Sequence, residues 1–252
     1  MSTVLVLTSL VASAPPASAQ VPLRERTPVV AGSFIFSSAG RGCTVGAVLK
    51  RYGPGSAVSP VAAATRYLVL AAHCAPHIDS EFSINNVPIG AVTWISPTDD
   101  LELVQVPPDV PSRGCFSYGC FVGGATPRPR AAGQVIMGPL HREAPVRMLP
   151  PASPAPGERF CTSGGVSSVN CNWVSEPNRP ADWGSQRGVL ARTLNAIAMT
   201  SGDSGGPVIS QQGNFYGIHT RGGTGPYPNL QEYIPAEQIF EQIGSEYGIA
   251  PG

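Results

Sequence analysis

Hydrophobic residues fall in short runs along most of the chain, separated by Gly, Pro, Ser and Asn. Runs of this kind, bounded by turn residues, are typical of the short strands of β-sandwiches and β-barrels. The pattern therefore predicts an all-β fold. The predicted strands lie at residues 33–36, 44–49, 66–72, 91–95, 101–106, 134–138, 159–163, 172–175, 189–199, 207–210 and 215–220.

One segment near the C-terminus has the pattern of an amphipathic helix. Pro235 stands directly ahead of residues 236–243, and proline suits the first turn of a helix. Ile239, Phe240 and Ile243 then share one face. We expect this short helix to pack against the second half of the fold.

Residues 107–133 are rich in proline and glycine and separate two groups of predicted strands. Such a stretch is a natural connector between two lobes. We expect a first lobe at residues 31–115 and a second lobe, with the helix, at residues 116–252.

The composition fits a folded protein with many turns. The chain has 252 residues, a formal net charge of +0 and only 13% charged residues. These values argue against nucleic acid or an anionic membrane as the main partner. The 29 glycines and 27 prolines approach the level of disordered chains, but 42% of the residues are hydrophobic, which favours turns between strands.

The first 19 residues have the pattern of a secretory signal peptide. An apolar run at residues 4–11, too short to span a bilayer, precedes Ala17-Ser18-Ala19, which matches a signal-peptidase site. No Lys or Arg precedes the run, so the charged start of such a signal is missing. We expect secretion, cleavage before Gln20, and a short leader or propeptide at residues 20–30.

The sequence Gly202-Asp203-Ser204-Gly205-Gly206 is the strongest candidate for chemistry. Glycines on both sides let the backbone turn tightly and bring its N–H groups close to a substrate carbonyl. An ordinary surface turn has the same residue types. Ser204 is therefore a candidate nucleophile that needs support from elsewhere in the chain.

Two further segments supply that support. His73, followed by Cys74, stands where the apolar run at residues 66–72 ends, and Asp99 and Asp100 open the run at residues 101–106. Taken singly, His73 could be a packed histidine and the aspartates a strand cap.

Together the three segments resemble the chymotrypsin-like (trypsin-like) serine peptidases, and in particular their secreted bacterial members. The order His, Asp, Ser along the chain is that of this family. The resemblance extends from about Ala31 to the C-terminus. It implies two six-stranded antiparallel β-barrels with the active site between them and a short C-terminal helix.

The motif around Ser204 also satisfies the G-x-S-x-G elbow of α/β-hydrolases. That fold needs an acidic residue and then a histidine after the serine. Here the only histidine after Ser204 is His219, and it precedes every following glutamate. The order excludes this alternative.

The resemblance assigns a role to each candidate. Ser204 is the nucleophile, His73 the general base, and Asp100 the group that orients the imidazole, with Asp99 as the adjacent alternative. The N–H groups of Gly202 and Ser204 form the oxyanion hole. No cofactor and no metal are implied.

In this family a salt bridge to the aspartate before the serine, here Asp203, sets the oxyanion loop. Its partner is a freed N-terminal amine or an internal arginine. Residues 29–32 weakly resemble such an N-terminus, after Arg26. Both partners remain open from the sequence.

The chain contains 6 cysteines, which suits an oxidising compartment and allows fifteen pairings. The sequence has no C-x-x-C pair with a histidine at the spacing of a zinc site, so the cysteines do not indicate a metal site. The resemblance pairs Cys43 with Cys74 and Cys161 with Cys171, and leaves Cys115 and Cys120 to close a small local loop.

The resemblance also locates a specificity pocket. No acidic residue occupies its base, so we do not expect a preference for Lys or Arg. His219 stands where glutamate-specific bacterial members carry a histidine that contacts the substrate carboxylate, and an imidazole with the hydroxyl of Ser201 can bind that group. The alternative is a packed His219 and a small apolar pocket. The expected substrate-binding residues are Ala198, Met199, Ser201, His219, Thr220, Arg221 and Gly222.

We therefore expect a secreted, monomeric serine endopeptidase that acts on polypeptides, with a preference for Glu before the scissile bond. The alternative is a latent or inactive peptidase-fold protein that serves as a secreted binding or adhesion module.

Overall fold

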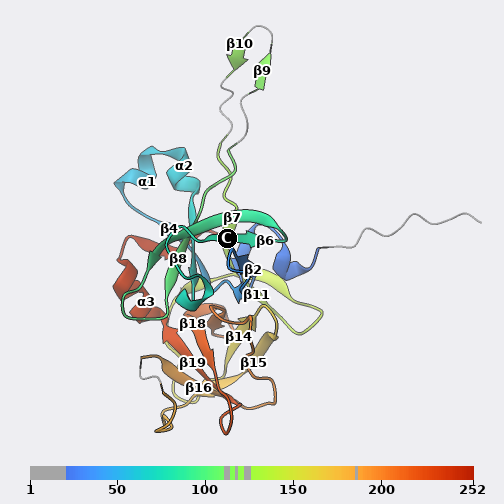
Figure 1. Cartoon of the computed structure of the whole chain (residues 1–252), viewed down its shortest axis with the longest axis vertical. Coiled ribbons are helices and arrows are strands. Elements are labelled where there is room, and N and C mark those ends of the chain that lie inside the picture. The colour runs from blue at the N-terminus through green and yellow to red at the C-terminus, as the bar shows by residue number, and fades with distance from the viewer. Residues whose placement is uncertain (1–20, 111–113, 117–118, 122–125, 185–186) are drawn as a thin grey trace, which may run out of the picture.

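The computed structural model describes residues 21–110, 114–116, 119–121, 126–184 and 187–252. Two large β-sheets, of eight and seven strands, lie one above the other, and a helix packs beside them (Figure 1). A three-stranded sheet and a two-stranded hairpin contain the other described strands. The helices are α1 (Pro54–Val58), α2 (Pro60–Ala64) and α3 (Ala236–Ile243), with 3₁₀ turns at Leu23–Glu25 and Ala72–Cys74. The predicted C-terminal helix is confirmed, whereas α1 and α2 were not predicted.

The strands alternate with short turns, as the hydrophobic pattern predicts. The first eight are β1 (Val29–Ala31), β2 (Phe34–Ser37), β3 (Gly42–Thr44), β4 (Ala47–Arg51), β5 (Arg66–Leu70), β6 (Glu81–Ile84), β7 (Val87–Ile95) and β8 (Glu102–Val106). The others are β9 (Gly114–Phe116), β10 (Gly119–Phe121), β11 (Ala131–Met137), β12 (Ala144–Arg147), β13 (Leu149–Pro151), β14 (Phe160–Gly164), β15 (Ser168–Ser175), β16 (Val189–Thr193), β17 (Pro207–Ile209), β18 (Asn214–Gly222), β19 (Leu230–Pro235) and β20 (Tyr247–Ile249).

The second lobe is a closed six-stranded barrel. Its strands follow the order β18-β17-β14-β15-β16-β19, and β19 pairs back onto β18. All of these pairings are antiparallel. The predicted strand at residues 189–199 ends earlier, at Thr193, because Asn195 Oδ1 accepts the N–H of Ile197 at 3.1 Å and turns the chain.

The first lobe is a curled sheet of order β20-β4-β5-β8-β7-β6-β2-β3, so it is open where a closed barrel was expected. The predicted strand 44–49 is bent at Gly46 and becomes β3 and β4, near opposite ends of the sheet. A Cβ at Gly46 would lie 2.3 Å from Ile218 Cγ2 and 2.4 Å from the carbonyl oxygen of Gly205. The bend therefore brings the first lobe against the second. The predicted all-β, two-lobed class is confirmed.

A shared apolar core joins the two lobes. Val69 of β5 and Leu103 of β8 pack in one cluster with Ile209, Ile218 and, from α3, Ile239. All five side chains are at most 3% exposed. This core fixes the strand ends that carry His73, Asp100 and Ser204.

The described part of the N-terminal segment is integrated into the fold. Strand β1 pairs in parallel with β11, and all three of its residues are buried. The predicted signal peptide at residues 1–19 and Gln20 lie outside the described residues. In the described part of the chain, no helix is long and apolar enough to cross a membrane.

Two predicted disulfides are confirmed, Cys43–Cys74 and Cys161–Cys171. The backbone register places Cys115 opposite Cys120 in the β9–β10 hairpin, which projects away from both sheets (Figure 1). The side chains of that hairpin lie outside the described part of the chain, so this third pair stays a prediction.

Candidate active site

His73 and Asp100 meet at the ends of two paired strands. His73 lies in the 3₁₀ turn after β5, Asp100 directly precedes Leu101 and β8, and β5 pairs with β8. Asp100 Oδ2 lies 2.6 Å from His73 Nδ1, and Asp100 Oδ1 accepts the backbone N–H of His73 at 2.8 Å. Both carboxylate oxygens thus fix the histidine, one through the ring and one through the backbone.

Asp99 is engaged elsewhere. Its Oδ2 accepts hydrogen bonds from Gln242 Nε2 at 2.6 Å and from the hydroxyl of Thr98 at 3.0 Å. The structure therefore places Asp100, and not Asp99, against His73.

The backbone of Ser204 lies beside the histidine loop. Its carbonyl oxygen accepts the N–H of Thr44 at 2.9 Å and lies 4.0 Å from Cys74 Sγ. Among the described residues, no hydrogen bond joins Ser204 Oγ to His73. Such bonds are often long in unliganded enzymes and tighten when the substrate is bound.

The loop at residues 200–204, which we call the oxyanion loop, leaves two N–H groups unused among the described residues. Residues 200–203 form a turn in which Asp203 N–H donates to the Thr200 carbonyl at 3.0 Å. Gly202, third in this turn, has a φ of 97°, as type II turns require. In the described part of the chain, neither Gly202 N–H nor Ser204 N–H donates to an acceptor. These are the two donors expected to form the oxyanion hole.

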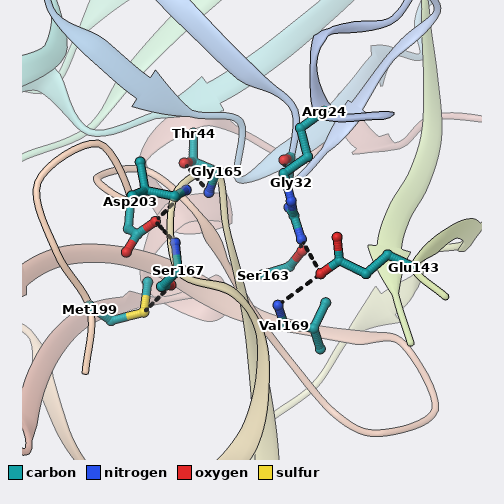
Figure 2. Close-up of polar contacts among 11 residues, drawn as sticks. Arg24, Gly32, Thr44, Glu143, Ser163, Gly165, Ser167, Val169, Met199 and Asp203 are labelled. Carbon is teal, nitrogen blue, oxygen red and sulfur yellow. Dashed lines mark hydrogen bonds and ion pairs between the residues drawn. The ribbon is translucent and has the colours of Figure 1, made fainter. Parts of the chain in front are cut away.

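The carboxylate of Asp203 is fully buried and is held by backbone N–H groups (Figure 2). Oδ1 accepts from Val166 at 2.9 Å and Ser167 at 3.0 Å, and Oδ2 accepts from Thr200 at 2.8 Å. Hydrogen bonds of this charge-assisted kind satisfy a buried carboxylate. Within the described residues no arginine and no amine ion-pairs with Asp203. Backbone N–H groups bind it instead of either partner considered from the sequence.

Thr44 connects this loop to the first lobe, and sequence reasoning gave it no role. Its hydroxyl donates to the Gly202 carbonyl at 2.7 Å and accepts the N–H of Gly165 at 2.8 Å. With its own N–H bound to Ser204, Thr44 holds the oxyanion loop on both sides of Asp203. Its place directly after Cys43 was the only available signal.

Glu102 is a second group that sequence reasoning missed. It lies on β8 two residues after Asp100, its side chain is fully buried, and neither carboxylate oxygen has a hydrogen-bond partner among the described residues. Burial, with a smaller contribution from the charge of Asp100, raises the pKa of Glu102 to about 9. The carboxyl is therefore neutral at neutral pH.

His219 is buried rather than open to solvent. The side chain is 2% exposed, and Nδ1 lies 3.0 Å from Gln231 Oε1. Burial lowers the pKa of His219 to about 4, against the opposing effect of the Asp203 charge. The imidazole is therefore neutral at neutral pH, and Gln231 is its nearest polar partner.

The other predicted pocket residues only partly converge. Met199 is 7% exposed, and a Cβ on Gly222 would lie 3.1 Å from its carbonyl oxygen, so these two adjoin. Thr220 donates its hydroxyl to the Glu232 carbonyl at 3.3 Å. The Arg221 guanidinium lies 5.0 Å from the Trp183 ring centre. Ala198 is half-buried and Ser201 is exposed.

The closed barrel, the curled sheet and the C-terminal helix define the fold of the bacterial chymotrypsin-like serine proteases. No protein-family model and no curated protein matches the sequence. Solved structures show the similarity instead.

Three of these structures illustrate it. Nocardiopsis protease is 18% identical, with a TM-score of 0.56, over 88% of this chain and 98% of the other. Thermobifida fusca protease A is 15% identical, with a TM-score of 0.58, over 88% and 98%. A glutamic acid specific serine protease that uses a histidine triad in substrate binding is 20% identical, with a TM-score of 0.58, over 88% and 100%. At these identities the likeness establishes the fold alone.

Proposed function

We propose that this protein is a secreted serine endopeptidase that hydrolyses peptide bonds through an acyl-enzyme. One observation carries the proposal: the loop that holds the His73–Asp100 pair lies beside Ser204, and the N–H groups of Gly202 and Ser204 donate to no acceptor among the described residues. A nucleophile, a base with its orienting group, and oxyanion donors are the parts that acyl transfer needs.

The contact between His73 and Asp100 supports one path for the proton. Because Asp100 Oδ2 binds His73 Nδ1, that nitrogen carries the hydrogen and Nε2 is the basic nitrogen. His73 Nε2 takes the proton of Ser204 Oγ as the oxygen attacks the peptide carbonyl. Collapse of the tetrahedral intermediate breaks the C–N bond, and His73 returns the proton to the leaving amine. Water, activated by the same nitrogen, then hydrolyses the ester.

Charge on the substrate oxygen develops during both steps. The N–H groups of Gly202 and Ser204 would stabilise it, and removal of one such donor in a related type of site costs about 10²–10³ in kcat. Asp203 and Thr44 hold the loop that carries both donors. Among the described residues, backbone N–H groups and the Thr44 hydroxyl hold this loop and no amine does, which supports activity without a maturation cleavage.

Labelling with a fluorophosphonate tests the proposal. The folded protein should react, and both Ser204→Ala and His73→Ala should abolish the reaction, whereas exposed His77→Ala should leave it unchanged. Folded protein that does not react would contradict the proposal and favour the binding or adhesion role. If the protein does react, peptide cleavage with a transient ester on Ser204 would establish the endopeptidase reaction.

A preference for Glu before the scissile bond is a second, separable proposal, and His219 with Ser201 would read the carboxylate. The chain has 4 histidines, of which His73 serves the triad, and His77 and His141 are exposed. His219 has Gln231 beside it, whereas the glutamic acid specific neighbour uses a histidine triad in substrate binding. A single imidazole, neutral in the free protein, would then recognise the substrate carboxylate.

The pH dependence of selectivity tests this arrangement. A bound Glu carboxylate favours protonation of His219, whose pKa is lowered to about 4 in the free protein. The ratio of kcat/KM for matched Glu and Gln peptides should therefore rise as the pH falls from 8 to 5, and the rise should vanish in His219→Leu. A ratio that stays constant, with small apolar residues preferred, would establish the apolar pocket beside Met199 instead.

A further inference from the structure

The N-terminal segment of residues 21–31 is anchored by a buried ion pair (Figure 2). Arg24 Nη2 lies 2.7 Å from Glu143 Oε1, and the two side chains are only 9% and 12% exposed. Arg24 Nη1 also donates to the Gly32 carbonyl at 2.8 Å and to Ser163 Oγ at 3.1 Å. A buried charge is tolerated only when it is paired and hydrogen-bonded, so these contacts satisfy most of the guanidinium.

These contacts converge on one point of the β14–β15 hairpin. Ser163 and Val169 face each other across the two strands. Arg24 binds Ser163, while Glu143 Oε1 accepts the N–H of Val169 at 3.0 Å. The four residues, which we call the N-terminal clamp, hold both strands directly below the hairpin turn.

The turn of the same hairpin supports the oxyanion loop. Residues 165–167 donate two N–H groups to Asp203 and one to Thr44, which in turn binds the Gly202 carbonyl. A displacement at the base of the turn would therefore move the donors of Gly202 and Ser204. Catalytic groups must be held to within about 0.5 Å of the productive geometry.

We propose that Arg24 is a positioning residue, and that its ion pair with Glu143 holds the β14–β15 turn where the oxyanion loop requires it. This inference rests on the proposed peptidase function. Its consequence is that cleavage within residues 25–28 lowers activity. That outcome is the reverse of activation by a new N-terminus near residues 29–32.

The test uses the full chain with Arg24→Met, Arg24→Lys and Glu143→Gln. Arg130→Met is the matched control, because Arg130 ion-pairs with Asp109 at 3.4 Å and donates to the Pro88 carbonyl, and none of these residues lies in the β14–β15 hairpin. We measure kcat, KM and the affinity for a peptide aldehyde, whose adduct carries an oxyanion.

Arg24→Met and Glu143→Gln should lower kcat by about tenfold, a fraction of the loss of a whole donor, with KM within about twofold. Aldehyde affinity should fall by the same factor as kcat, which a general loss of stability would not produce. Arg24→Lys should recover part of the loss, since it keeps the charge, and Arg130→Met should match the wild type.

Thermal denaturation accompanies each assay. If Arg24→Met does not fold, Ser163→Ala takes its place, because it removes one hydrogen bond of the N-terminal clamp. This variant should lose kcat and aldehyde affinity by equal factors, smaller than those expected for Arg24→Met. Unchanged kcat and aldehyde affinity in the folded variants would overturn this inference while the peptidase function stands. Absence of fluorophosphonate labelling in the wild type would instead overturn the proposed function.

Discussion

Removing the ionisable group of Glu102 should make the stability of the protein much less dependent on pH. Glu102 is 0% exposed and has no hydrogen-bond partner in the part of the chain that the structure describes, and its pKa is raised from 4.5 to about 9. A carboxyl with a raised pKa in the folded state contributes its stability fully below its unfolded pKa. That contribution is lost as the pH rises toward the folded pKa.

The size of the loss follows from these two values. Between pH 5 and pH 8 the unfolded chain has released the proton of Glu102, whereas the folded chain retains it. Each pH unit in this window costs about 1.4 kcal/mol, so the folded state loses up to about 4 kcal/mol. Relaxation around the side chain makes this an upper bound. Glu102→Gln cannot ionise and should escape the loss.

The assay is urea denaturation at pH 5 and pH 8 in a Ser204→Ala background, which prevents self-digestion. The free energy of unfolding of Glu102→Gln, relative to that of the parent, should increase by about 2–4 kcal/mol from pH 5 to pH 8. Comparison at each pH cancels the other titrating groups, His219 included. Exposed Glu81→Gln is the matched control and should follow the parent. Parallel curves for Glu102→Gln and the parent would refute a neutral, buried Glu102.

Two further predictions concern catalysis. Asp100→Asn should lower kcat by about 10⁴-fold, the scale known for this change in serine proteases, because it favours the wrong tautomer of His73. Asp99→Asn, which alters only the contacts with Gln242 and Thr98, should change kcat little, and the reverse result would identify Asp99 as the orienting group. Thr44→Val leaves the Gly202 carbonyl and the Gly165 N–H without their partner and should lower kcat by about tenfold with KM nearly constant. Thr44→Ser keeps the hydroxyl and should restore most of the rate, and equal rates for the valine and serine variants would contradict the positioning role of this hydroxyl.

The fold could be predicted where a hydrophobic run in the sequence corresponds to a strand in the structure. The run at residues 66–72 and the apolar residues after Asp100 correspond to β5 and β8, which pair and bring His73 and Asp100 together. The order of the motifs then placed Ser204 opposite them. These features depend on side chains that are visible in the sequence.

The residues that surround and hold the site could not be predicted from the sequence, for physical reasons. Asp203 is bound by backbone N–H groups, which every residue except proline possesses, so no residue type marks them. Arg24 stands in a polar segment and would ordinarily be solvated. The alternation Leu101-Glu102-Leu103 suggests an outward Glu102, but β8 lies between β5 and β7, and Glu102 points to the same side as buried Val104.

The last strand of the chain has a consequence for folding order. Strand β20 completes the edge of the first sheet against β4, and the final residues add hydrogen bonds from Ala250 to Val48 and from Gly133 to Pro251. During synthesis the first sheet therefore remains unfinished until β20, which follows every strand of the closed barrel, has left the ribosome. Pairings between such distant segments are slow to form. A nascent chain thus cannot complete its first lobe ahead of its second.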